Sequence, residues 1–236
     1  MIAGIRQRLC SAGRPDAGIS LPELIVAMMI FAIVLTVVGS VFATMTKATT
    51  YANATDRNVR NASNGMNGLT RMFRSAQNLP QVNTTDRPAF SVAQSESATF
   101  VTAVNLDPST ADDTTPLEVS FSVDASRNLR ETTRKAVHPA PTSPYWVFDA
   151  TSPRTSRTLT SPVSTTPSDQ NPLFRYFDAD GVELVPAAGS SLSGDALDDI
   201  ASVAITLRQA NTKSTLDNGV TLVNTVMLEN LRKGNG

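Results

Sequence analysis

The chain has 236 residues, and its 20 basic and 21 acidic side chains nearly balance, which argues against a polyanion as the partner of the whole protein. Apolar residues make up 41% of the chain, and the rest is rich in Thr, Ser, Ala, Asp and Asn with 14 prolines. This composition suits an exposed β-rich domain better than a dense α/β enzyme. The one cysteine, Cys10, precedes the main apolar run, so a chain without its N-terminal leader has no thiol for a disulfide, a zinc cluster or catalysis.

An uncharged, proline-free apolar run, LIVAMMIFAIVLTVVGSVFA, extends from Leu24 to Ala43. At ~1.5 Å per residue, a helix of this length spans ~30 Å, the thickness of the hydrocarbon core of a bilayer. A core helix of a soluble protein is rarely apolar on every face for so long, so the run predicts a membrane-spanning helix. A secretory signal cleaved after Ala43 is the alternative, because Val41 and Ala43 imitate an A-x-A site. Basic residues flank the run equally and leave its orientation open: Arg6, Arg8 and Arg14 precede it, and Lys47, Arg57 and Arg60 follow it.

Pro22 and Glu23 lie at the N-terminal edge of this run, where an ordinary anchor gains nothing from either residue. A proline costs little in the first turn of a helix, because the N–H groups there have no intrahelical partner, so Pro22 indicates a helix that begins near Ile19. A carboxylate at the edge of an apolar span is usually functional and paired. Cleavage after Gly18 would create an amine at Ile19, four residues before Glu23, in the same chain and in each neighbouring subunit. The alternative is that Pro22 and Glu23 are only the flank of an anchor.

The stretch GISLPELIVAM, residues 18–28, resembles the class III signal of type IV pilins and type II secretion pseudopilins, usually written G-F-T-L-x-E-L-x-V-A-M. Gly18 matches the residue before the cleaved bond, Leu21 the apolar third position and Glu23 the fifth position. Ile19 departs from the pattern, in which phenylalanine is commonest. The match continues through Leu24, Val26, Ala27 and Met28.

This resemblance implies that a prepilin peptidase cleaves after Gly18 and methylates the amine of Ile19. It implies a leader over residues 1–18 and a transmembrane or filament-core helix over residues 19–43. The C-terminal domain would lie outside the cytoplasm, and the subunit would later join a filament in the cell envelope or outside the cell. Glu23, with Leu21 and Pro22, would act in assembly by contacting a neighbour's N-terminus. The implied partners are the peptidase, other pilins or pseudopilins, the inner-membrane assembly platform and membrane lipid, with no cofactor and no metal.

An amphipathic continuation of the helix is expected over residues 44–79, because apolar residues recur there at steps of three and four. Pro80 stops it, so the predicted end is near Asn78. The apolar stripe is expected to pack on the following domain, with a groove for a partner helix as the alternative. Gly65 and Gly68 weaken the helix relative to Ala and mark a bend or a close approach of a sheet. The stripe consists of Val59, Ala62, Met66, Leu69, Phe73 and Ala76.

The apolar period changes to two after residue 88, which predicts a β-rich head within residues 80–236. One-sided alternation favours antiparallel pairing. The stretch LFRYFDADGVELV is expected to form a hairpin whose turn uses Asp and Gly chemistry, in preference to a calcium loop. This hairpin and the strands after it also resemble, more weakly, the C-terminal part of minor pilins of the W or pseudopilin J type. Further strands are expected at 97–104, 117–124, 129–137, 199–208 and 219–230, with a hairpin turn at Asn128.

Seven prolines between residues 139 and 172 predict a long irregular loop rich in Ser and Thr. Tyr145 and Trp146 are expected to fix this loop to the head, with a ligand contact as the alternative. His138 is the only histidine and lacks a nucleophile elbow nearby, so it is interpreted as a surface residue rather than a catalytic one. The chain also lacks a Gly-rich phosphate loop. Four cations in RNLRETTRK, residues 127–135, leave a local phosphate-contacting strip open, although a solvated strand face is favoured.

The sequence therefore predicts an α+β, pilin-like fold in which a long N-terminal helix packs on an antiparallel β-sheet head. The predicted function is a non-enzymatic minor pilin or pseudopilin of a type IV pilus-like or type II secretion filament. Its size and its proline-rich insertion favour a minor subunit, at the filament tip or in the initiation of assembly. The alternative is an uncleaved, single-pass anchored protein with an extracytoplasmic binding domain.

Overall fold

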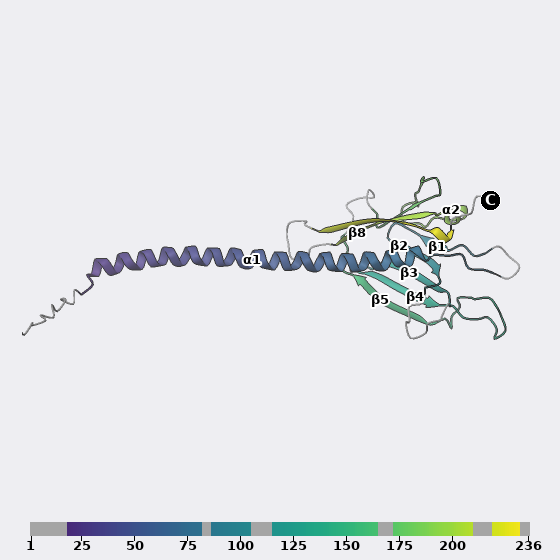
Figure 1. Cartoon of the computed structure of the whole chain (residues 1–236), viewed down its shortest axis with the longest axis horizontal. Coiled ribbons are helices and arrows are strands. Elements are labelled where there is room, and N and C mark those ends of the chain that lie inside the picture. The colour runs from purple at the N-terminus through teal and green to yellow at the C-terminus, as the bar shows by residue number, and fades with distance from the viewer. Residues whose placement is uncertain (1–17, 82–85, 105–114, 165–171, 210–218, 232–236) are drawn as a thin grey trace, which may run out of the picture. The chain divides into compact units, whose positions relative to one another are not determined.

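The computed structural model describes residues 18–81, 86–104, 115–164, 172–209 and 219–231, and Figure 1 shows its helices and strands. The chain divides into two compact units, residues 1–50 and residues 51–236. Helix α1, Leu21–Arg74, extends across this division. The part of α1 before residue 51 belongs to the candidate site and is described there.

The part of α1 in the second unit is amphipathic, as predicted. Its buried residues recur at steps of three and four, although Val59, expected at the start of the stripe, is 41% exposed. The helix ends at Arg74 rather than near Asn78, because the following residues turn to pair with the sheet: Ala76 forms a β-bridge with Thr102. The buried helical residues are Ala62, Gly65, Met66, Leu69, Met72 and Phe73.

The first sheet has five strands in the order β1-β2-β3-β4-β5, and every neighbouring pair is antiparallel. Alternate residues of its central strands are buried, which agrees with the period of two in the sequence. The strands are β1 Phe90–Ala93, β2 Ser97–Thr102, β3 Leu117–Val123, β4 Leu129–Lys135 and β5 Arg154–Thr160.

The second sheet has four strands in the order β7-β6-β8-β9, again antiparallel throughout. The strands are β6 Phe174–Phe177, β7 Glu183–Leu184, β8 Ser202–Gln209 and β9 Val220–Met227. Two short helices complete the described elements, α2 at Asp195–Asp198 and the 3-10 helix η1 at Glu229–Leu231.

The α+β arrangement of a long N-terminal helix on antiparallel sheets is thus confirmed, with two corrections. The head contains two sheets instead of one. The segment 139–172 is not irregular throughout, since β5 lies inside it and pairs with β4. Its sequence, RTSRTLT, shows no apolar alternation because β5 is an edge strand whose residues are mostly exposed. Pro153 and Pro162 flank this strand and do not interrupt it.

A cluster of aromatic rings joins α1 to both sheets. The Phe73 ring lies 4.7 Å from that of Phe100 on β2 and 5.4 Å from that of Phe174 on β6, measured between ring centroids. Phe121 and Phe90 also contact Phe73, at 5.7 and 6.3 Å. All five rings are at most 1% exposed, so Phe73 is the residue through which the helix is anchored in the core of the second unit.

Gly65 marks a close approach between α1 and the sheets, one of the two roles expected from the sequence. A Cβ atom at Gly65 would lie 3.1 Å from Thr160 Cγ2 and 3.2 Å from Leu207 Cδ2. Gly68 is less crowded, because its Cβ would lie 3.5 Å from the nearest atom, Leu159 Cδ2. The helix therefore passes β5 and β8 with a glycine at the tightest point.

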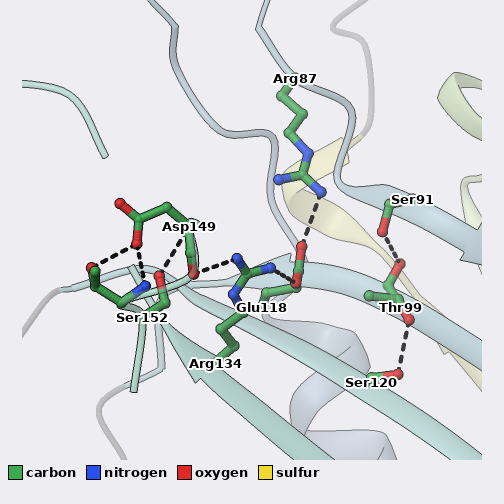
Figure 2. Close-up of polar contacts among 9 residues, drawn as sticks. Arg87, Ser91, Thr99, Glu118, Ser120, Arg134, Asp149 and Ser152 are labelled. Atoms are coloured by element: carbon green, nitrogen blue, oxygen red, sulfur yellow. Dashed lines mark hydrogen bonds and ion pairs between the residues drawn. The ribbon is translucent and has the colours of Figure 1, made fainter. Parts of the chain in front are cut away.

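Ion pairs hold the segment after β4 against the first sheet. Glu118 accepts hydrogen bonds from Arg87 at 3.0 Å and from Arg134 at 3.2 Å, and Figure 2 shows it between the two guanidinium groups. Arg134 also donates to the backbone carbonyl of Asp149 at 2.7 Å. The guanidinium carbons of Arg87 and Arg134 lie 5.7 and 5.8 Å from the ring centroid of Phe148. These contacts fix residues 148–149 on the sheet.

Candidate processing and assembly site

The start of α1 coincides with the stretch that the sequence singled out. Gly18, Ile19 and Ser20 precede the helix, and Leu21 is its first residue. The Leu24 N–H donates to the Ser20 carbonyl at 3.1 Å, which is the first hydrogen bond of the helix. Ser20 therefore occupies the N-cap position.

Pro22 and Glu23 both fit the positions that this start gives them. Pro22 is the second helical residue, where its missing N–H removes no intrahelical bond. Glu23 is the acidic residue of the first turn, where the helix dipole favours a negative charge by typically ~0.3–1 kcal/mol. The pattern Ser20-x-x-Glu23 is that of a capping box, a signal that the sequence analysis did not use.

The two residues that flank the candidate cleavage point lie outside regular structure. Gly18 and Ile19 are both exposed, Ile19 to 72%, and no atom lies within 4 Å of a Cβ built at Gly18. An exposed, non-helical peptide bond is accessible to a peptidase. Since Ile19 lies outside α1, the i, i+4 neighbourhood of a helix does not apply to Ile19 and Glu23 of one chain. The Glu23 side chain is exposed.

The apolar part of α1 is exposed on every face. All residues from 18 to 53 are exposed, and α1 contains an 18-residue window with a mean hydropathy of 2.8, none of it buried. By length and composition this helix can cross a membrane. The surface is unlike that of a buried core helix, which would have partners on at least one side.

The hydroxyl groups in this apolar part are satisfied within the helix. Thr36 donates to the Ala32 carbonyl at 2.8 Å, and Thr44 donates to the Ser40 carbonyl at 2.9 Å. Ser40 donates to the Val37 carbonyl at 2.8 Å. A hydroxyl that needs no water can enter a bilayer at low cost, so these residues do not interrupt the apolar surface.

Comparison with known proteins agrees with this location. Residues 13–39 match the family model described as the prokaryotic N-terminal methylation motif. No curated protein matches the chain. The methylation motif supports a type IV pilin-family substrate of prepilin peptidase, and together with the apolar helix it supports membrane anchoring. The motif implies processing by prepilin peptidase and other pilins as partners.

In the part of the chain that the structure describes, the other residues that the sequence singled out do not assemble into a second site. The His138 ring stacks on Trp146, with 3.7 Å between ring centroids, and its Nδ1 lies 3.0 Å from the Tyr145 carbonyl oxygen. Asp178 accepts hydrogen bonds from the N–H groups of Asp180 and Val182, which confirms the hairpin turn. Within the described ranges, no group of three or more His, Cys, Asp or Glu is placed to hold a metal ion.

The head also contains a cavity of about 900 Å³ near the β6–β7 hairpin. Its two guanidinium groups are already bound to carboxylates. Arg127 donates to both oxygens of Glu96 at 2.9 and 2.8 Å, and Arg175 forms a bidentate pair with Glu183. The hydrogen bond from Arg175 lowers the pKa of Glu183 below its usual value. These pairs stabilise the hairpin ends, and they present no free charge to a ligand.

Proposed function

We propose that the chain is a minor pilin or pseudopilin, a structural subunit that prepilin peptidase cleaves after Gly18 and methylates at Ile19. The cleaved subunit is drawn by an assembly platform into a type IV pilus-like or type II secretion filament, with its head outside the cytoplasm. Its place is at the filament tip or in the initiation of assembly, which the size of the chain and its proline-rich insertion favour. The proposal rests on one observation, the matched methylation motif at the start of a fully exposed apolar helix.

The same geometry supports a pairing role for Glu23 in the assembled filament. A carboxylate held in the first turn lies at the edge of a surface that is apolar on all sides, so water becomes scarce around it when helices pack together. A methylated amine on a neighbouring subunit supplies a charge of the opposite sign. Such a pair fixes the axial register of adjacent helices, because an offset helix leaves both charges without a partner.

The N-terminus of the mature protein tests the processing step. The full chain, with a C-terminal tag, is expressed in cells with and without prepilin peptidase, and the purified product is analysed by N-terminal sequencing and intact mass. We expect a chain that begins at Ile19 and carries one added methyl group only when the peptidase is present. A chain that begins at Met1, or beyond Ala43, contradicts the proposal and leaves an anchored or secreted domain.

The variant Glu23→Ala tests the pairing role. It is expected to be inserted in the membrane and cleaved normally, but to be lost from sheared filaments. Ser20→Ala is the matched control, because it weakens the same helix start by ~1 kcal/mol without removing a charge. If both variants are lost from filaments equally, Glu23 acts only by stabilising the first turn of the helix.

A further inference from the structure

The first sheet has one face against α1 and one face away from it, the outer face. Phe121 of β3 contacts Phe73 of α1, so its neighbours in the strand, Ser120 and Ser122, lie on the outer face. Strands β4 and β5 extend this face through their register with β3. Its three rows are Ser122–Arg130–Thr158, Ser120–Thr132–Ser156 and Glu118–Arg134–Arg154.

Arginines occupy the two ends of the outer face on β4 and β5. Arg134 and Arg154 lie directly opposite each other at one end, and like charges in such a cross-strand pair repel each other. Arg130, at the other end, is four residues from Arg134, which is ~13 Å along the strand. The middle row between these ends has only hydroxyl groups, and Thr132 donates to Ser156 at 3.2 Å.

Two of these arginines, Arg130 and Arg154, are exposed and have no carboxylate bonded to them in the described part of the chain. Arg154 forms no hydrogen bond there, and Arg130 donates only to the Ser156 hydroxyl, at 3.4 Å. Asp124 attracts Arg130, but its carboxylate accepts hydrogen bonds from its own turn. Both guanidinium groups therefore keep N–H donors for a partner outside the chain.

The third arginine, Arg134, shares a single carboxylate with another guanidinium group. Glu118 lies between Arg87 and Arg134 and accepts hydrogen bonds from both (Figure 2). Asp149 offers Arg134 its backbone carbonyl, while its carboxylate accepts from Thr151. Even with Asp149 counted, this end of the outer face has more positive than negative charges, because Arg154 adds a further guanidinium group.

We propose that the outer face binds an acidic polysaccharide, a linear polymer in which carboxylated sugars alternate with neutral ones. One carboxylate pairs with Arg130 and the next with Arg154, because a planar guanidinium group binds a carboxylate through two parallel hydrogen bonds. The hydroxyls of Thr132 and Ser156 can both donate and accept, so they match the hydroxyls of the neutral sugar between the two carboxylates.

The spacing of charge favours this polymer over nucleic acid. Each strand of DNA has a charge about every 3.4 Å, so the ~13 Å between the two ends would place several phosphates over the uncharged middle row. The three rows also contain no aromatic side chain on which a base could stack, and the nearby Phe148 ring is already packed against Arg87 and Arg134. The near balance of charge over the whole chain likewise suits a polymer of low charge density.

Binding of hyaluronate oligosaccharides, in which glucuronate alternates with a neutral amino sugar, tests this proposal. End-labelled oligosaccharides are titrated with the full chain in a nonionic detergent, and binding is followed by fluorescence anisotropy. We expect saturable binding that weakens as salt is added. Labelled dextran, which is neutral, should not bind, and single-stranded DNA with the same number of charges should bind more weakly than hyaluronate.

Paired substitutions locate the binding face. Arg130→Gln combined with Arg154→Gln is expected to raise the Kd for hyaluronate about tenfold or more, because two charge-assisted contacts are lost. Arg57→Gln combined with Arg71→Gln is the matched control, since it removes the same charge from two exposed arginines of α1, and it should leave the Kd nearly unchanged. The melting temperature of each double variant shows that the head remains folded.

A carboxylate in the middle row provides a second arm. Ser156→Glu puts a negative charge between the arginines, where it competes with the polymer, and should weaken binding several-fold. Thr155→Glu adds the same charge to the other face of β5 and should have little effect.

The proposal is overturned if hyaluronate does not bind, or if either variant weakens binding no more than its control. Tighter binding of DNA than of hyaluronate also overturns it and assigns the face to nucleic acid. The outer face lies in the head, so none of these outcomes bears on cleavage after Gly18, which is measured separately.

Discussion

The two parts of α1, before and after residue 51, differ in whether their apolar side chains are buried within the chain. From residue 21 to residue 50 every residue is exposed and most are apolar, so this part packs against none of the described residues of its own unit. After residue 51 one face is buried against two sheets and the other carries exposed asparagines such as Asn61, Asn64 and Asn67. A single helix thus combines a surface suited to lipid or to other helices with a surface suited to one fixed domain.

This difference indicates where each part gains its stability. The second part is stabilised by burial of apolar area inside its own chain, which is intramolecular and independent of concentration. The first part buries none of its apolar surface among the described residues, and its length and composition suit it to a lipid bilayer. Substitutions in the second part should therefore affect folding of the head, whereas substitutions in the first part should affect membrane insertion or assembly.

The largest expected effect is on folding, from Phe73→Ala. Removal of the ring that contacts four others leaves a cavity and should lower the free energy of unfolding of the head by ~3–5 kcal/mol. Phe31→Ala is the matched control, because Phe31 lies in the first part and is 66% exposed. Denaturation in detergent, followed by the emission of Trp146, the only tryptophan, measures both. Equal losses for the two variants would remove the distinction between the parts.

The next effect is on insertion. Val34→Lys puts a charge near the middle of the apolar part and should disfavour membrane insertion by ~2.5–3.5 kcal/mol. Asn61→Lys puts the same charge on the exposed face of the second part and should leave insertion unchanged. Fractionation of cells into membrane and soluble protein gives the comparison. Normal insertion of the Val34→Lys protein would show that this part of α1 does not cross the bilayer.

The sequence predicted the elements whose patterns are set by burial on one side. The stripe of Ala62, Met66, Leu69 and Phe73 and the alternation in β3 were found because a buried face repeats with the period of its own helix or strand. The start of α1 was found for a different reason, since Pro22 and Glu23 are unusual beside an apolar run.

The elements that sequence reasoning missed lack such a periodic signal. β5 is an exposed edge strand, so no apolar alternation distinguishes RTSRTLT from a loop. The division into two sheets depends on which strands pair across long distances in the chain, and the apolar pattern of a single strand does not indicate its partner. Phe174 of the second sheet, for example, contacts Phe73 of α1, about 100 residues earlier in the chain. The helix was predicted to end near Asn78, because Pro80 follows. It ends four residues earlier, at Arg74, because Ala76 forms a β-bridge with Thr102.

A smaller effect is expected from the glycines of α1. Gly68→Ala should stabilise the head by ~0.5–1 kcal/mol, because alanine favours the helix and the new Cβ would make only ordinary contacts, at 3.5 Å and beyond. Gly65→Ala should gain less or lose stability, since its Cβ would lie 3.1 Å from Thr160 Cγ2. Gly39→Ala, in the first part, should leave unfolding of the head unchanged. Equal gains at Gly65 and Gly68 would show that the helix does not approach the sheets as closely as the structure has it.

The smallest effect concerns charge, and it also separates the two parts. The hydrogen bond from Arg175 lowers the pKa of Glu183 in the folded head. The ion pair therefore stabilises the fold at a pH above the pKa of Glu183 in the unfolded chain, which is about 4.3. This stabilisation is lost as the pH falls through the lower pKa of the folded state. Both side chains are about one-third exposed or more, and solvent screening therefore limits the contribution to less than ~1 kcal/mol. Glu183→Gln should lower the melting temperature slightly at pH 7 and not at an acidic pH below the lowered folded pKa of Glu183, where the native carboxyl is also neutral. Glu23→Gln, in the first part, should change the melting temperature of the head at neither pH. A deficit of Glu183→Gln that persists at the acidic pH would mean that glutamine disturbs the hairpin by shape, and that the ion pair with Arg175 adds nothing measurable.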